Sequence, residues 1–339
     1  MNITKISTAS STAKTRKRAF HPRLFCIICL ALLALLTVLS LFTGRYPLSL
    51  EALLQGDELQ RRVFLNLRFS RTVVGLLGGF ALGVSGFVYQ TVFRNPLASP
   101  DIIGVSSGAS AGAAAGILFF SGSAAVTASA FAGALSAVVI VLLLSALDQT
   151  GRNTSIVLAG IAVHALAQTA LMCLKLTADP ERELASIEYW IMGSLNAVNL
   201  HSLGGNLLLC LLCLVLLFLL HRQIILLSGE EGEMKMLGVS VGKLRLLVLL
   251  TATLTVSSVV SLTGLISFVG LLAPHGARLI TRDNRQDTML LGGLLGGILL
   301  LGADILARSV SAVELPVSIF TSVLGAPFLI ALIGRRRAL

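Results

Sequence analysis

The sequence predicts an all-α polytopic membrane protein with about ten transmembrane helices. Of its 339 residues, 55% are hydrophobic and only 12% are charged, whereas roughly a quarter of the residues of a soluble domain carry charge. Apolar runs long enough to cross a bilayer, about 20 residues each, recur along the chain. Most of the 26 Lys and Arg residues stand in the N-terminal tail and in the short loops between those runs, as the positive-inside rule expects.

The apolar runs give the number of spans. The run 102–147 has room for two spans with a break at Ser121-Gly122-Ser123, and the run 246–277 has room for two with a break near Thr263-Gly264. The run before Asp304 is the weakest, because we expect that carboxylate to cut it short. Nearly charge-free runs occupy residues 24–44, 72–93, 102–147, 153–174, 189–221, 246–277, 288–303 and 315–334. Ten spans place both termini on one side of the membrane, which the basic residues predict to be the cytoplasm.

Residues 1–23 form a basic tail without any acid, and residues 24–339 form the predicted transmembrane domain. The first apolar run is longer than the core of a cleaved signal peptide and is not followed by an A-x-A-like site, so we expect an uncleaved first span. The net charge of +10 does not indicate nucleic-acid binding, because no basic face interleaved with aromatic residues is present.

The second span and its exit are the most unusual part of the sequence. Glycines recur four apart through residues 75–86 and 104–116, a spacing that predicts close helix packing in lipid. Between them, the stretch from Arg94-Asn95-Pro96 to Pro100-Asp101 does not continue a helix, because proline removes a hydrogen-bond donor. Non-helical backbone near membrane depth is tolerated where it is buried in protein or lines a cavity.

The loop 222–245 holds a predicted short helix. Ser228 and Glu231 have the S-x-x-E spacing of a capping box, and Gly238 stands where a left-handed C-terminal cap is expected. Met234 and Leu237 are three apart, so both project from one face. The loop is therefore either a capped helix that offers an apolar contact to a soluble partner or a solvated loop rich in helix formers.

Two segments predicted to lie outside the membrane stand out: an arginine-rich one, which conflicts with the positive-inside rule, and an acidic one, which marks a helix end. The predicted topology leaves five arginines outside between the first two spans, which an acidic extracellular partner would explain: Arg45, Arg61, Arg62, Arg68 and Arg71. The acidic segment 178–200 contains Tyr189-Trp190, which predicts a helix end at the headgroup level.

Prolines mark two of the later spans. Pro274-His275 is expected to break a span near its inner end, and His275 with Arg278 indicates either a proton relay or, as we favour, a cap at the end of the bundle. Pro316 enters the last span near its first turn, where proline is tolerated. The stretch from Gly325 to Pro327 is expected to loosen the middle of that span.

No residue pattern predicts enzyme or metal chemistry in this chain. The pairs Cys26/Cys29 and Cys210/Cys213 have C-x-x-C spacing, but each lies in an apolar run without a second pair or a histidine cluster, so we interpret them as apolar filler. The stretch 238–243, GVSVGK, is one residue too short between its glycines for a phosphate loop, and Leu244 replaces the Ser or Thr that binds Mg²⁺.

The chain from about residue 45 onward resembles a known family of transporters. RFSR (68–71), GVSGFVYQTVFRNPLASPDIIGVSSGA (83–109), YWIMGSL (189–195), LGVSVGKLR (237–245), GLISFVGLLAPHGAR (264–278), ADILAR (303–308) and ELPVSIFTSVLGAPF (314–328) resemble, in order, the FecCD/BtuC-like permease subunits of bacterial iron-siderophore, haem and vitamin B12 ABC importers. The resemblance implies the type II ABC importer permease fold, with ten transmembrane helices per subunit, in the bacterial cytoplasmic membrane.

The resemblance also implies roles for matching residues. The ATPase-coupling contact would fall on Met234, Leu237, Gly238 and Val239, and docking of an extracytoplasmic substrate-binding protein on Arg68, Arg71 and Arg308. Ser70 and Ser318 depart from the proline and glycine usual in the family, and we expect both to soften the local backbone. The remaining family-motif residues are Arg94, Asn95, Pro96, Pro100, Pro274, His275, Arg278, Asp304, Glu314, Pro316, Gly325 and Pro327.

The partners implied by the resemblance are a second permease subunit (a second copy or a paralogue), two cytoplasmic ATPase subunits and a binding protein. No cofactor is expected in this chain, because the ATPase subunits would bind ATP and Mg²⁺, so the chain is not expected to be an enzyme. Ferric siderophore is the favoured cargo, with haem and vitamin B12 as alternatives. A stand-alone secondary transporter is the rival class, and an intramembrane enzyme lacks a nucleophile–base pair.

Overall fold

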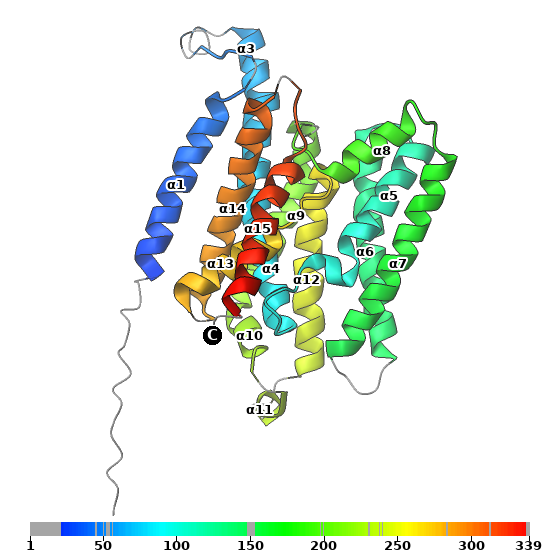
Figure 1. Cartoon of the computed structure of the whole chain (residues 1–339), viewed down its shortest axis with the longest axis vertical. Coiled ribbons are helices and arrows are strands. Elements are labelled where there is room, and N and C mark those ends of the chain that lie inside the picture. Colours follow the sequence, from blue (N-terminus) through cyan, green and yellow to red (C-terminus); the bar gives the residue numbers. More distant parts are fainter. Residues whose placement is uncertain are drawn as a thin grey trace, which may run out of the picture.

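The computed structural model describes residues 22–336 except positions 45, 50, 52–54, 56, 148–152, 197, 199, 230, 237, 239, 283 and 312. Within this part every regular element is a helix (Figure 1), as the composition predicts. The elements are α1 (Pro22–Phe42), α3 (Glu58–Val63), the π-helical turn η1 (Phe64–Phe69), α4 (Ser70–Val92), the 3-10 turn η2 (Pro100–Ile103), α5 (Val105–Phe119), α6 (Ser123–Ala146), α7 (Asn153–Thr177), α8 (Glu183–Met192), α9 (Leu200–Leu219), α10 (His221–Leu226), α11 (Glu231–Met236), α12 (Val241–Thr263), α13 (Val269–Thr281), α14 (Gln286–Ser309) and α15 (Val317–Arg336).

Ten of these helices stand at the places of the ten predicted spans. In the described part of the chain, six helices are long and apolar enough to cross a membrane, and α5, α9 and α15 contain shorter apolar helical stretches. With α13 between α12 and α14, the predicted fold class is confirmed. The predicted breaks are also present, since α5 ends before Ser121-Gly122 and α12 ends at Thr263. The side on which the termini lie stays a prediction.

One predicted span begins later than expected. Tyr189 and Trp190 belong to α8, a separate helix that ends at Gly193 with φ of +69°. The next helix, α9, starts only at Leu200. The prediction of a span from residue 189 onward was therefore wrong, because an apolar stretch alone does not distinguish a short helix and a turn from the start of a spanning helix.

Two residues expected to interrupt helices, Asp304 and Pro274, lie inside them, as does Pro327, which was expected to loosen the last span. α14 continues past Asp304 to Ser309, because the Asp304 carboxylate is buried in ion pairs with Arg71 and Arg308. Pro274 lies early in α13, and Pro327 lies inside α15. The expected break at Pro274 is therefore absent, and α15 is one continuous helix through Gly325–Pro327.

Glycine spacing sets two close helix crossings, as predicted. A Cβ added to Gly79 of α4 would lie 2.5 Å from the carbonyl oxygen of Gly296 in α14. A Cβ added to Gly108 of α5 would lie 2.5 Å from the carbonyl oxygen of Gly133 in α6. Without these glycines the backbones could not approach so closely, which is how small residues stabilise helix pairs in lipid.

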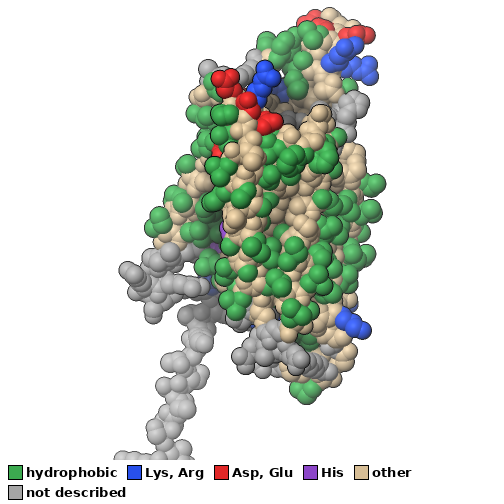
Figure 2. Space-filling model, turned by 90° about the vertical axis from the view of Figure 1, so that its right-hand side faces the viewer, with side chains coloured by type: hydrophobic (Ala, Val, Ile, Leu, Met, Phe, Trp, Pro, Cys, Tyr) green, Lys and Arg blue, Asp and Glu red, His purple; other side chains and the backbone are tan. Residues whose placement is uncertain are grey.

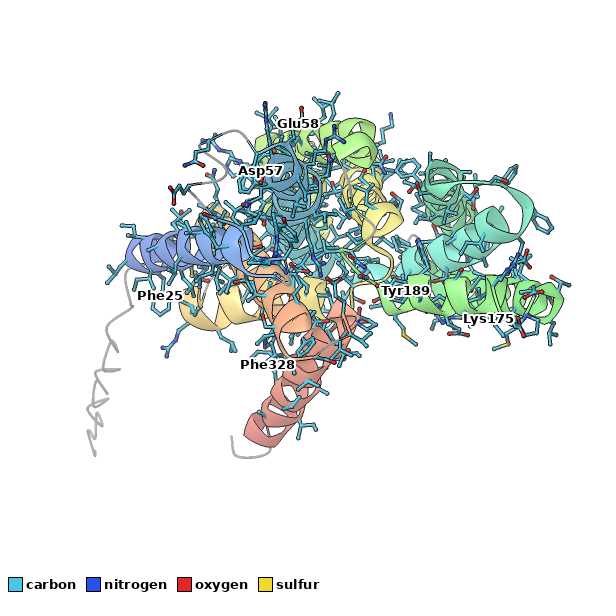
Figure 3. All side chains as sticks on the ribbon, turned by 90° about the horizontal axis from the view of Figure 1, so that it is seen from above. Phe25, Asp57, Glu58, Lys175, Tyr189 and Phe328 are labelled. Atoms are coloured by element: carbon cyan, nitrogen blue, oxygen red, sulfur yellow. The ribbon has the colours of Figure 1, made fainter. Side chains whose placement is uncertain are left out.

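The helices form a single bundle with two recognisable sides. Seen from above, α5, α6 and α7 lie together on the side that carries Lys175, while α1 with Phe25 lies on the opposite side (Figure 3). We call the end that carries α3 and α8, at the top of Figure 1, the upper end, and the end that carries α10 and α11 the lower end.

The surface pattern agrees with a bundle embedded in lipid. Figure 2 shows hydrophobic side chains over the middle of one face, while most of the coloured acidic and basic side chains gather at the upper end. Apolar side chains are exposed along α1 and α9, for example Ile27 and Leu212. Such exposure would be unfavourable in water over a patch of this size, so the chain is a multi-pass integral membrane protein.

Candidate functional site

The lower end of the bundle carries the short helices α10 and α11. Met234 of α11 is only 2% exposed and packs in the main core, whereas Met236 is 84% exposed. Gly238 is exposed and has a φ of +76°, the left-handed conformation expected for it. Leu237 and Val239 lie outside the described residues. Among the described side chains of α11, Met236 is the exposed apolar one, and the coupling role of Met234, Leu237, Gly238 and Val239 stays a prediction.

The capping expectations for this segment are met only in part. The Ser228 hydroxyl donates a hydrogen bond of 2.7 Å to the carbonyl oxygen of Ile225, which places Ser228 at the end of α10. Ser240 is the N-cap residue of α12, but its side chain makes no capping hydrogen bond. Met234 packs α11 against the core, whereas the side chain of Glu231, the second residue of the predicted capping box, lies outside the described residues.

Arg94 connects the end of α4 to this segment. Its backbone has a φ of +50°, which is uncommon for a residue with a side chain. In this conformation its guanidinium donates to the carbonyl oxygens of Leu227 and Gly229, between α10 and α11. Arg94 therefore links the α10–α11 segment to the end of α4.

Arg278 holds α13 to the same end of α4. Its guanidinium donates to the side chains of Gln90 and Thr91, to the carbonyl oxygen of Phe87 and to Asn284. It also lies 4.8 Å above the Phe87 ring, a cation–π contact. The lower ends of α4 and α13 are thus tied together through a charge bonded to neutral acceptors.

Buried ionic contacts hold the upper ends of α4, α14 and α15 together. Arg71 donates to Asp304 at 2.7 Å and to Glu314 at 3.0 Å, and Arg308 forms an ion pair with Asp304 at 2.8 Å. Arg71 and Arg308 are each 5% exposed, and Asp304 is fully buried. Such a cluster is costly to desolvate and costly to break once formed. We call Arg71, Asp304, Arg308 and Glu314 the ionic cluster.

Arg308 is also tied to the end of α1. Its guanidinium donates to the hydroxyl of Ser40 at 2.7 Å and to the carbonyl oxygens of Ser40 and Thr43. Arg68, in the π-helical turn, donates to the carbonyl oxygen of Tyr46. A cavity of about 160 Å³ lies beside these groups and is lined by Arg68, Arg71, Arg308, Asn196 and Glu314, among others.

This geometry changes the expectation for binding-protein docking. Arg71 and Arg308 are engaged by carboxylates of their own chain, so neither is presented to a partner as an exposed charge. Arg68 is also buried, but among the described residues it has no carboxylate partner and it lines the cavity. Arg61 and Arg62 of α3 are the exposed arginines nearby. The docking role of Arg68, Arg71 and Arg308 stays a prediction.

The other family-motif residues shape the backbone. Asn95 accepts a hydrogen bond from the Leu97 amide, which turns the chain before Pro96, and Pro100 starts the turn η2. His275 packs edge-on against Phe328, with ring centroids 5.8 Å apart. Pro316 is buried directly before α15. A Cβ added to Gly325 would collide with Phe268.

The two residues that depart from the family pattern make hydrogen bonds of their own. The Ser70 hydroxyl donates to the carbonyl oxygen of Leu65 at 3.0 Å, and the Ser318 hydroxyl donates to that of Leu265 at 2.6 Å. Both bonds tie neighbouring backbone segments together, so the expectation that Ser70 and Ser318 soften the backbone is not supported by their contacts.

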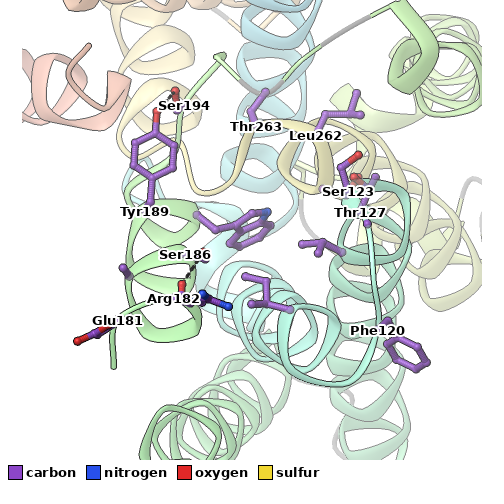
Figure 4. A pocket seen from close by; sticks show the side chains of 16 residues that line it. Phe120, Ser123, Thr127, Glu181, Arg182, Ser186, Tyr189, Ser194, Leu262 and Thr263 are labelled. Carbon is purple, nitrogen blue, oxygen red and sulfur yellow. Dashed lines mark hydrogen bonds between the residues drawn. The ribbon is translucent and has the colours of Figure 1, made fainter. Parts of the chain in front are cut away.

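A larger cavity at the upper end was not foreseen from the sequence. It has a volume of about 770 Å³ and lies between α8, the ends of α5 and α12, and the start of α6 (Figure 4). Its lining combines aromatic rings of α8 with hydroxyl groups such as those of Ser123 and Thr127. The cavity was not predictable because its lining comes from three separate stretches of the sequence. Tyr189-Trp190 was the only local signal, and we interpreted it as a headgroup anchor.

Metal-ligating residues are scattered in this structure. In the described part of the chain, no group of three or more His, Cys, Asp or Glu side chains is placed to hold a metal ion. All five cysteines are free thiols.

The bundle of ten helices, with a projecting helical segment at one end and a buried ionic cluster at the other, is the architecture of a multi-pass transport subunit. The chain belongs to the FecCD transport family, whose model matches residues 32–335. The chain is therefore a permease subunit of an ABC importer.

Relatives in this family serve different substrates. The molybdate import system permease protein MolB of Haemophilus influenzae is 34% identical over 300 residues, covering 86% of this chain and 89% of that protein. The Fe(3+)-citrate import system permease protein YfmE of Bacillus subtilis is 32% identical over 329 residues, covering 94% of this chain and 97% of that protein. A solved structure described as an inward-facing metal-chelate type ABC transporter is 34% identical, covers 93% of this chain and all of that chain, and has a TM-score of 0.83.

Proposed function

We propose that this chain carries a ferric siderophore complex across the cytoplasmic membrane as the permease subunit of an ATP-driven importer. The observation that carries the proposal is the likeness to the metal-chelate type transporter, at a TM-score of 0.83 over 93% of the chain. The ferric citrate relative supports the same class of cargo. The molybdate relative supports a second candidate, an oxyanion. Haem and vitamin B12 remain the alternatives that the sequence motifs left open.

The energy source in this proposal is a pair of cytoplasmic ATPase subunits that contact α11. Met236 is exposed and lies two positions before the exposed Gly238, so an apolar groove on the ATPase could hold it. Met236→Asp is expected to abolish co-purification with the ATPase, because a carboxylate would be desolvated in such a groove, while Met236→Leu preserves it. Equal co-purification of both variants would contradict the coupling role.

The second permease subunit in this proposal covers the exposed face of α7. His164 is exposed there at a position inside a span, and an ionisable group in contact with lipid is unfavourable. A partner subunit or a water-filled path would remove that contact with lipid. The basic tail 1–23 then lies in the cytoplasm with the C-terminus.

The binding protein is proposed to dock on the upper end. Arg61 and Arg62 are exposed on α3, and Arg68 borders the 160 Å³ cavity, which an acidic side chain could enter. Rim charges of this kind mainly steer association. Arg61→Glu is expected to slow docking chiefly at low salt, where screening is weak. Unchanged association rates at every salt concentration would rule out docking of the binding protein on this surface.

Uptake measurements test the cargo directly. Cells with and without this chain receive radioactive iron as a siderophore complex, as ferric citrate and as haem, with labelled cobalamin and molybdate in parallel arms. Loss of siderophore uptake alone supports the proposal. Loss in another arm alone reassigns the cargo. Uptake that survives ATP depletion but stops when the proton gradient is dissipated indicates the secondary-transporter rival.

A further inference from the structure

The cavity of about 770 Å³ at the upper end has the size of a small-molecule site, which is typically 300–1,000 Å³. It is bounded by α8 on one side and by α5, α6 and α12 on the others, as Figure 4 shows. Its apolar lining comes from aromatic and aliphatic residues of separate elements, including Trp190, Ile117, Val126 and Leu262. Helix packing therefore leaves a hollow that no side chain of the described residues fills.

The charge in the cavity is positive. Arg182 and Glu181 both border it, but Figure 4 shows the Arg182 guanidinium directed toward the hollow and the Glu181 carboxylate directed away. In the described part of the chain, the Arg182 guanidinium has neither an ion pair nor a hydrogen bond. An anion that enters the hollow would meet this unpaired cation beside an aromatic wall.

Aromatic and hydroxyl groups complete the lining. Tyr189 donates to the Ser194 hydroxyl at 3.2 Å, which fixes its ring at the cavity edge. Among the described contacts, the hydroxyls of Ser123 and Thr127 have no hydrogen-bond partner, although both line the cavity. Flat aromatic ligands stack on such rings, and free hydroxyls can bond to ligand oxygens.

We propose that this cavity is a receiving site for an anionic metal chelate that carries aromatic rings, of the tris-catecholate type. The chelate's rings would contact Trp190 and its negative charge would face Arg182. The inference rests on the proposed import function, since it adds a binding step at the upper end to that function. It also narrows the cargo, because a neutral chelate without rings would use neither contact.

The chain reports binding by itself, because Trp190 is its single tryptophan. The purified full-length chain in phosphatidylcholine vesicles is titrated with a ferric tris-catecholate and, in parallel, with an uncharged ferric trihydroxamate. Quenching of the Trp190 emission that saturates with the catecholate, and retention of the radioactive complex by the vesicles, are the expected results. Equal quenching of free tryptophan amide would show only optical absorption and would overturn the assignment, as would equal binding of both chelates.

Variants separate the two contacts. Arg182→Gln is expected to weaken retention of the catecholate about tenfold, as the loss of one charge-assisted hydrogen bond, and Arg182→Lys to weaken it less. Trp190→Leu is expected to weaken it about fivefold. Arg282→Gln removes one exposed positive charge at the lower end and should leave retention unchanged. A similar loss for Arg282→Gln would assign the effect to net charge and overturn the proposal.

Two further outcomes decide between this site and its alternatives. If phosphatidylglycerol in the vesicles displaces the chelate, the cavity binds lipid headgroups and the proposal fails. If siderophore uptake by the complete importer is normal in Arg182→Gln and Trp190→Leu, the receiving site fails while the import function stands. If cells with and without the unaltered chain take up the siderophore equally although the chain binds the catecholate, the import function is reassigned to another cargo.

Discussion

Arginines tie helices together at both ends of the bundle, but the partners differ. At the upper end, Arg71 and Arg308 share the fully buried carboxylate of Asp304. At the lower end, Arg278 and Arg94 donate to carbonyl oxygens, to amide oxygens and to a hydroxyl. The upper contacts are between full charges in a dry site, and the lower contacts are between a charge and neutral groups.

This difference predicts different mobility at the two ends. Separating buried opposite charges leaves each of them desolvated, which typically costs 3–5 kcal/mol. Losing a hydrogen bond from a charge to a neutral acceptor costs about 1.5–3 kcal/mol, and less where water can replace the acceptor. We therefore expect the upper ends of α4, α14 and α15 to move as one body and the lower ends to rearrange when the α10–α11 segment moves.

The largest effect is expected at Asp304. Asp304→Ala should lower the free energy of unfolding by about 3–5 kcal/mol, because Arg71 and Arg308 would remain buried without this shared carboxylate. Denaturant titration of the purified chain, followed by the Trp190 emission, measures the change. Replacing Asp304, Arg71 and Arg308 together by apolar residues of similar volume should recover part of the loss.

Glu58→Ala is the matched control for Asp304. Glu58 pairs with Arg62 at 3.5 Å, but the two side chains are 85% and 75% exposed, so its removal should cause no measurable change. A similar loss in Asp304→Ala and Glu58→Ala would contradict the distinction between buried and exposed ion pairs at the upper end.

The second effect is expected at Arg278. Arg278→Ala should lower the free energy of unfolding by about 1.5–3 kcal/mol, less than Asp304→Ala. Arg278→Lys should recover only part, because an ammonium does not reproduce the forked contact with Gln90 and Thr91 or the stacking on Phe87. The same titration measures both variants. If Arg278→Ala and Asp304→Ala lower the free energy of unfolding equally, the proposed difference between the two ends of the bundle is contradicted.

The helices of this fold could be predicted because a lipid-embedded backbone must satisfy its own hydrogen bonds over about 20 apolar residues. The breaks at Ser121-Gly122-Ser123 and at Gly264 could also be predicted, because apolar runs longer than one span must contain a turn and these residues are typical of turns. Asp304 was misread as a helix end because its partners, Arg71 and Arg308, are recognisable only in three dimensions. Partners of opposite charge offset part of the cost of burying a charge inside a span.

The candidate sites were less predictable than the helices. The sequence located the α10–α11 segment, but the face of a six-residue helix depends on how it docks, so Met234 was expected at the contact and Met236 occupies the exposed position. The cavity beside Trp190 depends on three stretches that are distant in sequence, within residues 117–127, 181–194 and 261–263. No local pattern encodes it.

The third effect is expected in coupling rather than in stability. Arg94→Ala should leave the unfolding curve nearly unchanged, because Arg94 is exposed. It should lower siderophore transported per ATP hydrolysed about fivefold, as the loss of roughly one hydrogen bond between α4 and the α10–α11 segment. Measurements on the complete importer in vesicles test this. Unchanged coupling would show that α4 is not linked to the ATPase through Arg94.

The smallest effect is expected at Ser318, at the start of α15. Its hydroxyl donates to the Leu265 carbonyl oxygen, which lies in the non-helical stretch between α12 and α13. Ser318→Ala removes this one neutral hydrogen bond and should cost about 0.5–1.5 kcal/mol. Ser309→Ala is the control, because the exposed Ser309 hydroxyl bonds only within its own helix, to Ile305. If the two variants have equal stability, the Ser318 bond does not hold α15 to the α12–α13 connection, and the upper ends of α14 and α15 would be joined mainly through the ionic cluster.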